Sequence, residues 1–107
     1  MWLFQNDSFI SVVAHRDKLG HLLVRSRIEG DIERAIPTAE VYQDASADYR
    51  YRAVITQEAL KDALIAAVNE IDYGNFKGSV KDLRRHDAYM RVWSVMAQEY
   101  GAYGDSA

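Results

Sequence analysis

The stretch Ile71-Asp72-Tyr73-Gly74-Asn75-Phe76-Lys77 separates two differently patterned parts of the chain. Before it, short apolar runs alternate with turn residues, which is typical of a small sheet. After it, apolar residues recur at helical spacing. Gly74 suits the left-handed end of a helix, and Ile71 and Phe76 can anchor a corner in the core. The stretch therefore predicts a corner between two helices that cover a sheet.

Two amphipathic helices are expected on either side of this corner. The first is predicted over residues 57–71, with Thr56 as its N-cap. Its apolar stripe follows the helical series Leu60, Ala63, Leu64, Ala67, Val68 and Ile71. The second follows Ser79-Val80-Lys81-Asp82, which resembles a capping box, and runs to about Tyr100. One wide face of it carries Leu83, His86, Tyr89, Met90, Trp93, Met96, Ala97 and Tyr100.

Upstream of these helices, residues 9–16 and 21–28 read as a hairpin around a loop that ends at Gly20. A four-residue loop predicts a buried face in which like residues lie opposite each other: Phe9 and Ile28, Ser11 and Ser26, Val13 and Val24, His15 and Leu22. A three-residue loop with a bulge at Gly20 is an alternative that would shift these pairs.

The remaining segments complete a sheet with one short helix. The aromatic residues 1–5 predict an edge strand, and residues 29–36 predict a short helix that Pro37 stops. Residues 39–43 and 49–55 predict a second hairpin, which pairs Val41 with Tyr51 and Glu40 with Arg52. Strand alternation then places Tyr49, Tyr51, Ala53 and Ile55 on one face, and Arg50, Arg52 and Val54 on the other.

This element order predicts an α+β fold. We expect an antiparallel sheet of four to five strands, built from two hairpins, with one short and two longer helices packed on one face. A ferredoxin-like arrangement is one candidate, although two tight hairpins fit its helical crossovers poorly. Residues 1–107 are expected to form a single domain, with 101–107 as a flexible tail.

Composition removes several classes of function. The chain has 107 residues, no cysteine and a net charge of −3. Without cysteine it cannot hold a disulfide, a thiolate metal site or a cysteine nucleophile. The mild charge gives no global argument for nucleic acid or an anionic membrane as a partner. No apolar run is long enough for a membrane span, and the first residues lack signal-peptide features. We therefore expect a soluble, cytoplasmic protein.

Three segments together resemble a known group of sequences. They are the aromatic start, the stretch 71–77, and Tyr89-Met90-Arg91-Val92-Trp93-Ser94-Val95-Met96. With a strand like Asp48-Tyr49-Arg50-Tyr51-Arg52-Ala53-Val54, they resemble a family of small uncharacterised bacterial proteins. The resemblance covers most of the chain and implies a family without implying a function or a site residue.

The first candidate site is a sheet face that carries arginine. Arg25, Arg27, Arg50 and Arg52 occupy alternate strand positions, and Tyr42 shares their surface if the two hairpins lie in one sheet. Guanidinium groups bind phosphate and carboxylate bidentately, and aromatic neighbours can stack on bases. The structural alternative is an exposed face with ordinary cross-strand ion pairs.

The second candidate site is the basic start of the last helix. Lys81, Arg84 and Arg85 lie there, together with Lys77 and Arg91. Free N–H groups and nearby cations can bind an anion at a helix N-terminus. The alternative is a solvated face in which Asp82 pairs with Arg85 and Asp87 with Arg91.

These observations favour a binding protein over an enzyme. No catalytic motif, metal signature or cofactor fingerprint occurs, so no catalytic residue, metal or cofactor is assigned. Our first hypothesis is a small non-enzymatic protein that docks on a protein partner, or on a second copy through the Trp2 and Phe4 edge. The alternative is an anion or nucleic-acid binder that uses Arg25, Arg27, Arg50, Arg52 and the basic helix start.

Overall fold

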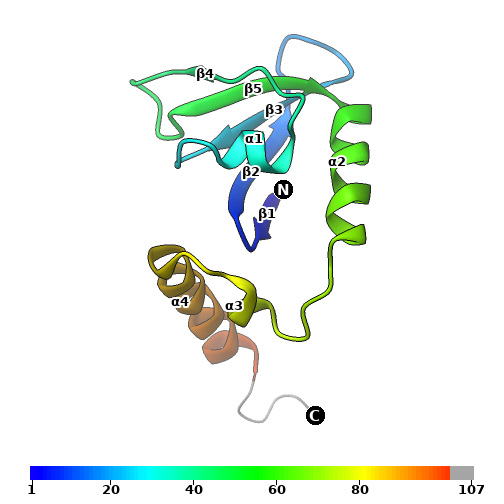
Figure 1. Cartoon of the computed structure of the whole chain (residues 1–107). Coiled ribbons are helices and arrows are strands. Elements are labelled where there is room, and N and C mark those ends of the chain that lie inside the picture. Colours follow the sequence, from blue (N-terminus) through cyan, green and yellow to red (C-terminus); the bar gives the residue numbers. More distant parts are fainter. Residues whose placement is uncertain (102–107) are drawn as a thin grey trace. The chain divides into compact units, whose positions relative to one another are not determined.

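The computed structural model describes residues 1–101, which form two compact units (Figure 1). The first unit spans Met1–Asp72 and the second begins at Tyr73, so the boundary falls inside the stretch 71–77. The predicted α+β class is confirmed, because a five-stranded sheet occurs together with helices. The single-domain organisation stays a prediction, and residues 102–107 of the expected tail lie outside the described residues.

The first unit holds the sheet and two helices. Its elements are β1 (Trp2–Gln5), β2 (Ser8–Ala14), β3 (His21–Ser26), α1 (Asp31–Ala35), β4 (Tyr42–Gln43), β5 (Tyr51–Thr56) and α2 (Gln57–Asn69). The strand order is β1-β2-β3-β5-β4, and every neighbouring pair is antiparallel. A ferredoxin-like arrangement is not confirmed, because the sheet has the order β1-β2-β3-β5-β4 and hairpins join β1 to β2 and β2 to β3.

The β2–β3 hairpin forms with a register one residue away from the expected one. Val12 lies opposite Val24, and Ser11 lies opposite Arg25. The His15 amide donates to the His21 carbonyl at 3.0 Å, so the loop between them has one residue more than expected. The His15 ring Nδ1 accepts from the amides of Asp17 and Lys18, which shapes the start of that loop. Because the register is shifted by one residue, the two faces of β2 are exchanged: Ile10 and Val12 point into the core, and Val13 is exposed.

The β4–β5 hairpin differs from the expected pairing by two residues. Tyr42 lies opposite Arg52 and Gln43 opposite Tyr51, so the expected pairs of Val41 with Tyr51 and Glu40 with Arg52 do not form. An even shift leaves each side chain on its predicted face, and Ala53 and Ile55 are buried as expected. Tyr49 is the exception, because it precedes β5 and its ring contacts arginines of the opposite face.

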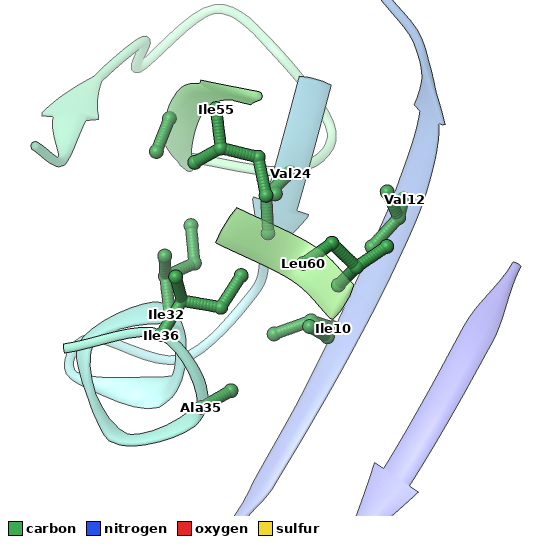
Figure 2. Packing of buried hydrophobic residues seen from close by; sticks show 9 residues of the cluster. Ile10, Val12, Val24, Ile32, Ala35, Ile36, Ile55 and Leu60 are labelled. Carbon is green, nitrogen blue, oxygen red and sulfur yellow. The ribbon is translucent and has the colours of Figure 1, made fainter. Parts of the chain in front are cut away.

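Helices α1 and α2 both pack on one face of the sheet. The core joins Ile10 and Val12 of β2, Val24 of β3, and Ala53 and Ile55 of β5 to residues of both helices: Ile32, Ala35 and Leu60, together with Ile36 just after α1 (Figure 2). Leu60 lies over the strands where α2 begins. Burying these aliphatic side chains supplies the main favourable term in the folding of this unit.

Helix α1 is held in place by an ion pair between a buried carboxylate and a partly exposed guanidinium group, which the sequence did not predict. Asp31 is fully buried, and its carboxylate contacts the Arg34 guanidinium and accepts from the Phe9 amide at 3.0 Å. Arg34 Nε also donates to the Asp7 carbonyl at 2.8 Å. These bonds fasten α1 to the turn between β1 and β2. Gly30 starts the helix with a positive φ of 91°, which glycine tolerates best.

The α2 helix begins as expected and ends differently. Thr56 is its N-cap, since the Thr56 hydroxyl oxygen accepts from the Ala59 amide at 3.1 Å. The helix ends at Asn69 with Glu70 as C-cap in a right-handed conformation. Gly74 has no positive φ, so the expected left-handed stop at Gly74 is wrong. Hydrogen bonds from the Glu70 and Ile71 amides to carbonyls in the last helical turn finish the helix before that glycine.

The second unit consists of α3 (Phe76–Ser79) and α4 (Leu83–Tyr100). Asn75 caps α3, and Asp82 caps α4 by accepting from the Arg85 amide at 2.9 Å. The expected capping box that starts at Ser79 is wrong, because Ser79 is the last residue of α3. The Phe76 ring stacks on Tyr89 at 6.0 Å, which fixes α3 against the first half of α4.

We predict that Gly30→Ala lowers the free energy of unfolding by about 1–2 kcal/mol, because an alanine at positive φ is strained. Its Cβ would also lie 2.7 Å from an Arg34 nitrogen and would disturb the Asp31 ion pair. Gly74→Ala is the matched control and should leave stability nearly unchanged, since a Cβ there meets nothing within 4 Å. Urea unfolding followed by circular dichroism measures both. Equal losses would contradict the assigned role of Gly30.

Candidate functional site

The second face of the sheet carries the candidate site. Because strand side chains alternate, the neighbours of the core residues Val12, Val24 and Ala53 point to the opposite side. The register places these residues on that side: Trp2, Phe4, Phe9, Ser11, Val13, Leu23, Arg25, Tyr42, Arg52 and Val54. We call it the arginine face. Helices α1 and α2 pack on the other side, so neither of them covers it.

One line of side chains crosses all five strands of this face. Trp2 lies opposite Ser11, Ser11 opposite Arg25, Arg25 opposite Arg52, and Arg52 opposite Tyr42. We call these five residues the cross-strand row. With strands about 4.8 Å apart, the row is roughly 19 Å from end to end. An aromatic residue stands at each end, and two arginines stand near the middle.

Apolar side chains border the cross-strand row on both sides. Val13, Leu23 and Val54 lie opposite one another in the next line along the strands. On the other side, the Phe4 and Phe9 rings stack at 4.6 Å, and Trp2 meets Phe9 edge-on at 6.2 Å. Arg25 and Arg52 therefore have the apolar residues Leu23 and Val54 on one side, and Arg27 and Arg50 at the next alternate strand positions on the other.

Tyr49 brings a third arginine to the row. The guanidinium carbons of Arg25 and Arg27 lie 4.7 and 4.3 Å from the centre of its ring, and Tyr49 is buried. Arg27 also donates to the Asp48 carbonyl at 3.1 Å. Cation–π contacts and backbone bonds hold these side chains in fixed positions. Such rigid guanidinium groups are suited to recognising an anion.

The two arginines of the cross-strand row have little acidic compensation. Like charges directly opposite each other in a strand pair repel. Arg52 has a side chain only 18% exposed, and the Asp48 carboxylate lies 3.9 Å from its Nη2, too far for a good hydrogen bond. Asp48 itself is 70% exposed, and its Oδ1 accepts from the Tyr49 amide. The pair with Asp48 therefore offsets little of the repulsion.

Arg25 is also incompletely bonded among the described residues. Its Nη2 donates to the Ser11 hydroxyl at 2.8 Å, but its Nε is buried without a hydrogen-bond partner. A buried donor without a partner costs about 1–3 kcal/mol. Such a group in a folded protein calls for a physical explanation, and a ligand of the site is one.

The other predicted site residues do not belong to the cross-strand row. Arg50 precedes β5, and its Nε donates to the Gln43 side chain at 3.2 Å. In the second unit, Lys81 donates to the Gly78 carbonyl, Arg84 is exposed, and buried Arg85 contacts the Tyr89 hydroxyl at 3.3 Å. The Asp82 carboxylate already occupies the start of α4, where an anion was expected. We therefore build no proposal on the second cluster.

Three neighbours of the arginines escaped prediction. Ser11 was assigned to a buried pair with Ser26, because the hairpin register was one residue off. Tyr49 was placed on the same face as Ala53 and Ile55, because the alternation of β5 was extended past its first residue. Trp2 was expected at an edge strand, but its alignment with Arg25 follows only from two successive strand registers. Alternation identified the arginines, whereas their surroundings depended on register.

Other parts of the chain offer less chemistry. Among residues 1–101, no group of three or more His, Asp or Glu side chains is placed to hold a metal ion, and no helix is long and apolar enough to cross a membrane. In the β4–β5 loop, a hydrogen bond from the Ser46 hydroxyl lowers the pKa of Asp44. This Asp44 carboxylate shapes the turn, since it also accepts from the Ser46 amide at 3.0 Å.

Comparison with known proteins gives no further guide. No protein-family model, curated protein or solved structure matches the chain. The resemblance to a bacterial family stays a prediction, and function has to be argued from the arginine face itself.

We predict that the Tyr49 ring holds Arg25 and Arg27 in position. Tyr49→Leu should lower the free energy of unfolding by about 1–2 kcal/mol, through the loss of two cation–π contacts. Tyr49→Phe keeps the ring and should retain most of that stability. Guanidinium NMR signals of both arginines should move in Tyr49→Leu and stay near their original positions in Tyr49→Phe. Identical behaviour of the two variants would exclude this role of the ring.

Proposed function

We propose that this chain is a non-enzymatic interaction protein that binds a protein partner through its arginine face. The observation that carries the proposal is the cross-strand row, which lines up Trp2, Arg25, Arg52 and Tyr42 across one sheet. Trp, Tyr and Arg are the residue types that most often dominate binding energy at protein interfaces. Trp2 and Tyr42 are exposed, so they are available as anchors at the two ends.

The surroundings of the row support a protein partner. Val13, Leu23 and Val54 give the surface an apolar part, and the arginines give it specificity. A protein interface typically combines an apolar centre with a few well-placed polar groups and arginines. The guanidinium groups are pinned by Tyr49, Ser11 and backbone carbonyls, which reduces the entropy lost when a partner binds.

Charge distribution favours a protein over a nucleic acid. Residues 1–72 carry twelve acidic and eight basic side chains, a net charge of −4. A polyanion would be repelled by most of this unit, and three arginines neutralise only a short run of phosphates. A compact positive group in an acidic unit suits one or two acidic side chains of a protein. We keep an anion or nucleic-acid binder as the second hypothesis, because the face combines arginines with aromatic rings.

We also propose a cytoplasmic location. The support is the complete absence of cysteine, which fits a reducing compartment. The partner is another protein or a second copy of this chain, and both would use the same face.

We predict that Trp2→Ala and Tyr42→Ala each weaken binding of the partner at least about tenfold, because both remove an aromatic anchor. The measurement is affinity capture from an extract of the cells that contain the protein, followed by titration of the captured partner. If the partner is a second copy of this chain, analytical ultracentrifugation of the purified protein measures the affinity of the dimer instead.

The second unit supplies matched controls. Trp93 and Tyr100 of α4 are exposed residues of the same types, and Trp93→Ala and Tyr100→Ala should leave binding unchanged. Loss of binding only with the α4 variants would move the interface to α4 and defeat the proposal. Binding that falls steeply with salt and requires nucleic acid would favour the second hypothesis.

A further inference from the structure

We infer that Arg25 and Arg52 together form a receptor for a carboxylate of the partner, most simply an aspartate or glutamate side chain in a segment lying along the cross-strand row. This inference rests on the proposed function and names the chemistry of its central contact. It assigns a ligand class to the two guanidinium groups, whereas the apolar anchors at Trp2 and Tyr42 set the limits of the bound segment.

Repulsion between the two guanidinium groups favours a negatively charged ligand. Arg25 and Arg52 are direct cross-strand partners. Among residues 1–101, Arg52 has the Asp48 carboxylate at 3.9 Å, and its charge also helps to lower the pKa of Asp44, but neither acid makes a close hydrogen bond with it. Arg52 is mostly withdrawn from water, so solvent screens the repulsion only in part. A carboxylate between the two groups converts one repulsion into two attractions. The free protein thus carries a cost that an acidic partner removes.

The two arginines also have hydrogen-bond donors that are not fully used. The Arg52 Nε donates a hydrogen bond to the Tyr49 carbonyl at 3.1 Å, while its Nη2 lies 3.9 Å from the Asp48 carboxylate. Its Nη2 is therefore not held by a close hydrogen bond to that carboxylate. Arg25 is fixed by the Ser11 hydroxyl and by Tyr49, and it holds a buried Nε–H without a partner among the described residues. Two fixed guanidinium groups present several donors to one small oxoanion.

The shape of the cross-strand row favours a carboxylate over a chain of phosphates. A guanidinium fork matches the two oxygens of a carboxylate bidentately. The row runs roughly 19 Å, which an extended segment of about six residues would span. Only its middle carries arginines, while its ends carry Trp2 and Tyr42. This pattern fits a peptide with an acidic centre and apolar ends, whereas a nucleic acid would present phosphates along the whole length.

The test uses a defined probe, the peptide acetyl-Glu-Glu-Glu-amide, with acetyl-Gln-Gln-Gln-amide as its uncharged counterpart. Guanidinium Nε–Hε NMR signals report on each arginine separately. We expect the glutamate peptide to shift the signals of Arg25 and Arg52 in a saturable manner, while the glutamine peptide shifts neither. Arg16, exposed in the β2–β3 loop, serves as the internal reference and should stay unmoved.

Charge-conserving variants separate a shaped receptor from plain attraction. Arg25→Lys and Arg52→Lys keep the charge and lose the fork, so each should weaken binding of the glutamate peptide at least tenfold. Arg16→Lys is the matched control and should bind as the original chain does. Folding of each variant is checked by its amide spectrum, and the signal shifts in the unaltered protein remain decisive if a variant fails to fold.

Three outcomes would overturn the inference. The first is the absence of any shift at Arg25 and Arg52 with millimolar glutamate peptide. The second is undiminished binding by both lysine variants. The third is tighter binding of inorganic phosphate or oligothymidylate than of the peptide at equal ionic strength. If one of these outcomes is found while capture of the partner still requires Trp2 and Tyr42, only the carboxylate inference fails. If capture of the partner does not require Trp2 and Tyr42 either, the proposed function fails as well.

Discussion

A strand residue next to a core residue must point away from the core, and the arginine face depends on this constraint. Val24 and Ala53 are completely buried beneath α1 and α2. Arg25 and Arg52 follow and precede them in their strands, so both arginines are forced to the other side. Because β3 and β5 pair directly, the same constraint also places them opposite each other. The core thus determines which side the charges occupy and how close together they lie.

The side on which the helices pack depends on a second set of contacts. Helix α1 has only five residues and cannot hold itself in place. Its position comes from Ile32 and Ile36 in the core and from the Asp31–Arg34 pair, which reaches the turn before β2. Breaking that pair would leave a buried carboxylate uncompensated, which is far costlier than losing a surface ion pair. The buried charge therefore secures the helix that covers the core face.

The sequence was sufficient for the fold class, the edge position of β1, the α2 N-cap and the alternation of β5. These features depend on local patterns: an aromatic start, a threonine before an apolar stripe, and a period of two. The pairing registers of the strands were harder to predict from the sequence. A hairpin loop that is longer by one residue costs little free energy, and yet it exchanges the two faces of a strand. Tyr49 was missed because Arg25 and Arg27 are distant in sequence. The pair of Asp31 with Arg34 is local, but the burial of Asp31 and its bond from the Phe9 amide depend on tertiary packing. Gly74 was misread because hydrogen bonds at residues 70–71 already end α2.

Within the unit Met1–Asp72, α1 and α2 cover one face of the sheet and neither of them covers the arginine face. The most direct measurement is methyl NMR of the free protein with a soluble paramagnetic agent. The account predicts strong relaxation enhancement for Val13, Leu23 and Val54, which border the cross-strand row, and little for Val12, Val24 and Ile55 in the core. Equal protection of the two sets would contradict it, because the arginine face would then already be covered in the free protein.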